Sequence, residues 1–281
     1  MRARARIVVV ADPSRGSRLA TVRGEPPLLP RRTLSADPAD GVQLHLVGGA
    51  AGPLGGDDLG LEIEVGPGAR LCVRGVAASL ALPGKAGGAS RLHVTARVAA
   101  GGVLRWLPEP LIGAAGCDHV TVTEVDCAEG AALCWREELV CGRYAEPGGD
   151  VRISTTLRYG GRTLLRNDLA VGPRAPGWSG PAVLGGARVV GSVLVVDPAW
   201  ARTGLPPAAG CPPTARPGVV SAARPDGVPA DLPTDVSAAV LPLAGGPAVL
   251  VSAVGSDPRA VRAQLDRLSR LGKPDRSAAL A

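Results

Sequence analysis

The sequence contains no phenylalanine, and aromatic residues make up 2% of its 281 residues. The core must therefore be built from valine, leucine, isoleucine and alanine. The scarcity of aromatic side chains also argues against a surface on which nucleic-acid bases could stack. The net charge of +6 indicates an acidic partner or simple solubility. Because the arginines are scattered and not clustered, we expect no nucleic-acid partner.

Long apolar runs are missing as well. The N-terminus combines basic residues with an apolar segment, residues 7–11, which is too short for a signal-peptide core or a membrane span. We interpret this segment as a first strand and expect no membrane partner. The six cysteines form neither CxxC pairs nor a zinc spacing, which predicts free thiols in a reducing cytoplasm. They are Cys72, Cys117, Cys127, Cys134, Cys141 and Cys211.

The motifs of several enzyme classes are absent. Neither Gly-Lys pair, at residues 84–85 and 272–273, is followed by serine or threonine, so there is no P-loop. The glycines of residues 51–60 lead into a strand and cannot place a phosphate on a helix N-terminus. Residues 177–181 miss the spacing of a nucleophile elbow. We therefore expect a protein that is not an enzyme, with an unrecognised hydrolase or transferase site as an alternative.

Strand signals dominate what is present. Apolar and polar residues alternate over residues 59–65, 91–98 and 151–159, which is typical of half-buried strands. Three similar segments, residues 64–71, 97–104 and 126–133, each place a glycine in a turn between two strands. The spacing of about 30 residues predicts stacked strand–turn–strand layers, either β-helix-like or a long sandwich. Chance similarity between hairpins is the alternative. We therefore predict a mainly β fold of many-stranded stacked sheets.

The C-terminal third is punctuated by proline. Residues 204–233 contain eight prolines and few large apolar residues, which predicts a loop or a disordered segment. A hairpin follows over residues 237–254, and then a helix with Asp257 as N-cap and Pro258 as first residue. Positions 261, 265 and 268 form its apolar stripe, and Gly272 ends it. We expect one β-rich domain from residues 1–203 and 234–272, one or two helices near the C-terminus, and a frayed tail at 273–281.

Carboxylates gather in one place. Asp57, Asp58, Glu62 and Glu64 lie close together, and the two glutamates share one strand face. Such a group can hold a divalent ion weakly, although a solvated hairpin face explains it as well. Elsewhere, Glu109 and the pair at residues 137–138 stand beside tryptophans, as partner contacts or as ordinary strand-end charges.

The three histidines offer few sites. Cys117, Asp118 and His119 could supply metal ligands, but we favour a turn with an exposed histidine. We interpret His45 and His93 as surface residues or as satisfied strand residues.

Five segments, in this order and spacing, resemble the urease accessory protein D family, UreD, which is also called UreH. They are LHLVGGAAGPLGGDDLGLEIEVGPGARLCV, VLRWLPEPLIGAAGCDH, LCWREELVCGRYAEPG, RTLLRNDLAV and AVLVSAVGSDPRAVRAQL. The resemblance implies a β-rich stack with two helices. It also implies a scaffold that docks on apo-urease, recruits the F-type accessory protein and the G-type GTPase, and helps pass nickel to the urease site. A structural β-rich adaptor is the alternative.

The same resemblance suggests roles for particular residues. It implies no tightly bound cofactor and transient nickel(II), which loosely binding, dispersed carboxylates could conduct. Asp57, Glu62 and Glu64 are then candidate groups on the nickel path, and Glu109 and Glu138 are weaker ones. The residues expected to pack the sheet or to brace a turn are Trp106, Trp135 and Arg143.

Overall fold

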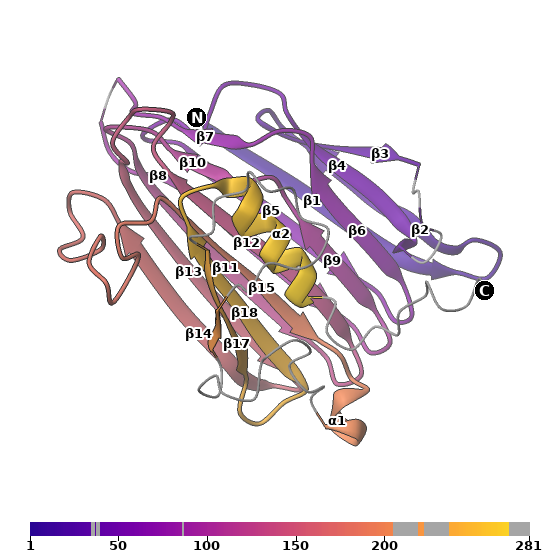
Figure 1. The fold of residues 1–281 in the computed structure, drawn as a ribbon. Helices are drawn as coiled ribbons and strands as arrows, with labels where there is room; N and C mark the ends of the chain where they lie inside the picture. The colour runs from indigo at the N-terminus through magenta and orange to yellow at the C-terminus, as the bar shows by residue number, and fades with distance from the viewer. Residues whose placement is uncertain (35–36, 38–39, 86, 205–218, 222–235, 270–281) are drawn as a thin grey trace, which may run out of the picture.

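The computed structural model describes residues 1–34, 37, 40–85, 87–204, 219–221 and 236–269 (Figure 1). These described residues form two β-sheets, one of seven strands and one of eleven. The mainly β, stacked architecture predicted from the sequence is thereby confirmed. Among the helices described, none is long and apolar enough to cross a membrane.

The seven-stranded sheet, sheet A, runs in the order β14-β13-β11-β8-β5-β1-β2. Its five central strands are parallel, and the two edge strands pair antiparallel. The parallel pairing follows from the layered path of the chain, which leaves this sheet after each strand and returns one layer further on. The strands are β1 (Arg2–Asp12), β2 (Gly16–Gly24), β5 (Asp58–Val65), β8 (Ser90–Val98), β11 (Asp118–Cys127), β13 (Asp150–Tyr159) and β14 (Arg162–Val171).

The eleven-stranded sheet, sheet B, runs in the order β16-β17-β18-β15-β12-β9-β6-β4-β3, with two further short strands, of which β10 pairs with β12 and β7 pairs with β10. Four of its strands, from β4 to β12, are parallel. The strands are β3 (Leu28–Thr33), β4 (Val42–Gly48), β6 (Arg70–Gly75), β9 (Val103–Leu107), β12 (Ala132–Cys141), β15 (Val189–Val196), β16 (Val219–Ser221), β17 (Ser237–Pro242) and β18 (Ala248–Gly255), with β7 (Ser79–Ala81) and β10 (Leu111–Gly113) as the short pair.

The turns between the sheets stack on one another. Gly68, Gly101 and Gly130 have positive φ angles of 65°, 70° and 81°, a region that favours glycine. The amide of Gly68 donates to the carbonyl of Ala100 (3.2 Å), and that of Gly101 donates to Gly130 (3.2 Å). The weak repeat in the sequence therefore marks real layers, each of which crosses from sheet A to sheet B.

The core lies between the two sheets. Alternate residues of β5, β8 and β13 point inward as predicted, so that residues such as Ile63, Val94 and Leu157 are buried together with Leu71 and Leu104 of sheet B. In place of phenylalanine, two tryptophans fill the middle of sheet B. Trp106 and Trp135 are register partners on β9 and β12, and their rings stack with centroids 4.9 Å apart.

The C-terminal hairpin and helix also follow the prediction. β17 and β18 pair antiparallel, and α2 (Pro258–Ser269) lies across the outer face of sheet B (Figure 1). The Asp257 side chain accepts the amide of Arg259 (3.1 Å) at the start of this helix. Val261 and Leu265 are fully buried against β15 and β18. A one-turn helix, α1 (Trp200–Thr203), follows β15.

Three expectations fall mostly or wholly outside the described residues. They concern the proline-rich segment 204–233, the end of α2 at Gly272, and the tail 273–281. Within the first of these, residues 219–221 are described and form β16, which pairs with β17.

Candidate functional site

The two glutamates of β5 lie on the outer face of sheet A. Glu62 and Glu64 point away from the core, and both meet Arg6 of the neighbouring parallel strand β1. The guanidinium of Arg6 lies 3.4 Å from the Glu62 carboxylate and 2.8 Å from that of Glu64. All three side chains are in contact with solvent, where such pairs contribute about 0–1 kcal/mol. This part of the acidic strand is therefore a solvated, ion-paired face.

Asp57 lies apart from these glutamates. Its residue surface is only 4% exposed, because it closes the turn before β5. One carboxylate oxygen accepts the amide of Leu54 (2.8 Å), and the other pairs with the amino group of Met1. The structure thus does not bring Asp57 together with Glu62 and Glu64. No group of three or more His, Cys, Asp or Glu residues within the described ranges is placed to hold a metal ion.

The structure does bring Glu109 and Glu138 together. Arg262 of α2 reaches both, with its Nη1 atom 2.8 Å from Glu109 and its Nη2 atom 2.6 Å from Glu138. Arg136, two residues before Glu138 on β12, lies 3.5 Å from Glu138 and 3.0 Å from Asp266. These five residues, here called the helix clamp, tie α2 to sheet B. Glu138 lies at the centre of the helix clamp, and its side chain is only 2% exposed.

The carboxylate of Glu137, the residue before Glu138 on β12, points to the inner face of sheet B. Glu137 lies between the two sheets, where its carboxylate accepts hydrogen bonds from Trp135 Nε1 (3.1 Å), Thr123 Oγ1 (3.0 Å) and Thr155 Oγ1 (2.8 Å). Sequence reasoning did not single it out as a metal ligand. The available signal was its position two residues after Trp135, which places both side chains on the inner face of the strand.

Arg143 braces the turn after β12. Its guanidinium donates two hydrogen bonds of 2.7 Å to Glu146, and these bonds lower the pKa of Glu146 to about 2. From β15's side, Arg188 donates to the carbonyl of Cys141 (2.7 Å) and to that of Glu146. The turn is therefore held at both of its ends.

The sequence predicted that His119 is an exposed residue in a turn, and this prediction is wrong. It is 1% exposed, because β11 already begins at Asp118 and directs the next side chain inward. Its Nδ1 atom lies 2.8 Å from Ser90 Oγ and its Nε2 atom 3.0 Å from Thr121 Oγ1. Burial lowers the pKa of His119 to about 4 and raises that of Cys117 to about 11. Both ring nitrogens are occupied by hydroxyl groups, so His119 is a satisfied core residue.

The other two histidines are as expected. His45 Nδ1 lies 2.9 Å from the hydroxyl of Thr33, and His93 Nε2 lies 3.1 Å from the exposed carboxylate of Glu124. The described cysteines, Cys72, Cys117, Cys127, Cys134 and Cys141, are free thiols.

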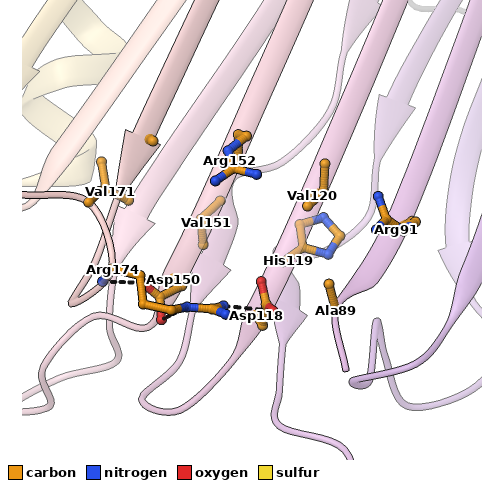
Figure 2. A pocket seen from close by; sticks show the side chains of 12 residues that line it. Ala89, Arg91, Asp118, His119, Val120, Asp150, Val151, Arg152, Val171 and Arg174 are labelled. Atoms are coloured by element: carbon orange, nitrogen blue, oxygen red, sulfur yellow. Dashed lines mark hydrogen bonds and ion pairs between the residues drawn. The ribbon is translucent and has the colours of Figure 1, made fainter. Parts of the chain in front are cut away.

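A hollow of about 250 Å³ opens on sheet A beside His119 (Figure 2). At its base, Asp118 and Asp150 are neighbours on adjacent parallel strands, and Arg174 bridges them at 2.6 Å and 3.0 Å. This guanidinium compensates the repulsion between the two carboxylates. The rest of the lining combines further arginines with small apolar side chains: Ala89, Arg91, His119, Val120, Val151, Arg152, Ala170, Val171 and Ala175.

Comparison with known proteins gives one consistent result. The family model for the UreD urease accessory protein matches residues 1–280. A urease accessory protein UreD from a Parafrankia species is 43% identical over 96% of this chain and 88% of its own length. The UreD of Streptomyces avermitilis is 43% identical over 97% of this chain and 98% of its own length. That of Frankia casuarinae is 40% identical over 95% and 88% of the two chains.

Proposed function

The chain belongs to the UreD family of urease accessory proteins, and from this we propose that it serves urease maturation as a scaffold for nickel delivery. It docks on apo-urease together with an F-type accessory protein and a G-type GTPase, and helps pass nickel(II) to the urease active site. The observation that supports this proposal is the family match over residues 1–280. The GTPase is a separate partner because this sequence carries no P-loop.

In this scheme the chain performs no catalytic step. It holds no tightly bound cofactor, and nickel is a cargo that it contacts transiently. We place the process in the cytoplasm, where the free thiols of the described cysteines would stay reduced.

The nickel path uses carboxylates that bind weakly because they are dispersed or already engaged. We propose Asp57, Glu62 and Glu64 as contact points, with Glu109 and Glu138 as secondary ones. We add Glu137 to this proposal, because its carboxylate lies between the sheets beside two threonine hydroxyls. Oxygen ligands of this kind hold a borderline divalent ion less tightly than a cage of cysteine and histidine does.

Complex formation is the first test. Purified chain should co-precipitate with urease subunits and with the F-type partner, and the absence of both complexes would overturn the proposal. The path is tested separately with Asp57→Ala combined with Glu64→Ala, which should leave the complexes intact and lower the nickel content of urease. Because Asp57 is buried, Asp57→Asn with Glu64→Gln should be measured in parallel, since it preserves the side-chain volumes.

A control with the same change in charge is available on β11. Glu124→Ala with Asp126→Ala removes two exposed carboxylates from the same outer face, two strands away from β5, and should leave nickel loading unchanged. If complexes form and no path variant lowers nickel loading, the chain acts as a structural β-rich adaptor. The layered fold supports that second function, because stacked strands present extended binding surfaces.

A further inference from the structure

The hollow beside His119 carries two guanidinium groups that form no ion pair with a carboxylate of the described residues. Arg91 on β8 and Arg152 on β13 are the register partners of Val120 on β11, one on each side of it. Figure 2 shows Val120 between the two arginines. Among the residues that the structure describes, no carboxylate lies within ion-pair distance of either guanidinium. The carboxylates at the base of the hollow are both occupied by Arg174.

The next carboxylate along the sheet is occupied as well. Asp58 on β5 is the other register partner of Arg91, but its side chain pairs with Arg2 (3.1 Å) and Arg4 (3.0 Å). On its other side, Arg152 faces Ala170 of β14. Neither arginine therefore has a free acidic neighbour in its own row.

Another row of the same three strands shows what is missing. Six residues further along, Arg97 and Arg158 are the register partners of Asp126, one on each side. In that row, the register places an aspartate between two arginines on the outer face. In the row of the hollow, a valine takes the place of that aspartate, and open space lies in front of it.

We propose that this hollow is a binding site for a single carboxylate group, which enters between Arg91 and Arg152. The lining arginines and aspartates leave one net positive charge, and His119 adds none because its pKa is about 4. One carboxylate balances this charge, whereas a phosphate dianion would exceed it. Guanidinium groups match the planar carboxylate well, and the alanine and valine side chains suit a short aliphatic stem.

The size of the site restricts the ligand further. A volume of about 250 Å³ is smaller than typical pockets for drug-sized ligands and fits an acidic side chain or a small carboxylic acid. An acidic side chain of a partner in the urease assembly is one source, which depends on the proposed function. A free small acid is the other source, and the carboxylate chemistry of the site is the same for both.

The chemistry is tested first with propionate, which reproduces the end of a glutamate side chain. The NMR signals of the Arg91 and Arg152 Nε–H groups are assigned by their loss in the single variants Arg91→Gln and Arg152→Gln. These signals should shift saturably when propionate is added, and should not shift with neutral propionamide. In the double variant Arg91→Gln/Arg152→Gln, the affinity should fall by about tenfold or more, because two charge-assisted hydrogen bonds are lost. The double variant Arg97→Gln/Arg158→Gln makes the same change in charge on the same strands and should bind propionate normally.

Three results would overturn the site: the absence of saturable shifts, an equal loss in the control variant, or tighter binding of inorganic phosphate than of propionate. The source of the carboxylate is tested by measuring how tightly the chain binds the urease subunits and the F-type partner. If only the Arg91→Gln/Arg152→Gln variant binds these partners more weakly than wild type, the carboxylate belongs to a partner side chain. If this variant forms the complexes as wild type does, the carboxylate is that of a free acid. If the wild-type chain forms no complex but binds propionate, the proposed function fails while the site stands.

Discussion

Replacing Glu138 with glutamine should lower the free energy of unfolding by about 2–4 kcal/mol. The Glu138 side chain is 2% exposed and receives three contacts from Arg262, the shortest of them 2.6 Å. Removing one member of a buried ion pair typically costs about 3–5 kcal/mol. The estimate is lower here because each arginine keeps a second carboxylate: Arg262 keeps Glu109, and Arg136 keeps Asp266.

Urea unfolding measured by circular dichroism gives this free energy, and hydrogen exchange locates the change. The amides of β15 and β18 beneath α2 should exchange faster in the variant, because the helix is tied less firmly. Glu109→Gln is the matched control, since this 32% exposed side chain contacts the same Arg262 and should contribute less than about 1 kcal/mol. An effect of Glu138→Gln below about 0.5 kcal/mol, or one smaller than that of the control, would refute the structural role of the clamp. A stable variant with impaired nickel loading would instead assign Glu138 to the path.

Two further predictions concern buried positions. The pKa of His119 is about 4 in the folded chain, against an ordinary value of 6.5. Between these two pH values, His119 is protonated in the unfolded chain and neutral in the folded one. Stability should therefore fall as the pH drops from about 6.5 to about 4, by up to about 3 kcal/mol. Chemical denaturation across this range should show a smaller decline for His119→Gln and an unchanged one for the exposed His93→Gln. Gly191→Ala should destabilise by about 1–3 kcal/mol, because the new Cβ would lie 2.5 Å from Leu265 Cδ1. A neutral result in urea unfolding would show that the Leu265 side chain or α2 can move aside.

The fold was largely predictable because its signals are local. Alternation within β5, β8 and β13 fixes which side chains face inward. The turn glycines at 68, 101 and 130 repeat at a spacing close to one layer, which predicted stacking, with chance similarity between hairpins as the alternative. The amide contacts of these turns depend on backbone angles that favour glycine. The repeat is therefore visible in the sequence mainly at its glycines and not as a longer motif.

The site was less predictable because its partners are distant in sequence. Glu138 and Arg262 are separated by 124 residues, and no periodicity connects a strand to a helix that crosses it. His119 was misplaced for a related reason. Its surroundings depend on Ser90, which reaches it only once β8 and β11 are paired. Glu137 was interpreted as a partner contact or a strand-end charge because a carboxylate on the inner face of a strand is uncommon and needs threonines from the opposite sheet.

The stacked turns also have a consequence for evolution. Neighbouring strands of a sheet are about 4.8 Å apart, and each layer takes about 30 residues of chain. Inserting or deleting one whole layer would therefore change the distance between the two ends of the stack by a single fixed increment. Each remaining layer would keep its own contacts, because it touches only the layers beside it. The length of the stack can in this sense be altered only in discrete steps of one layer.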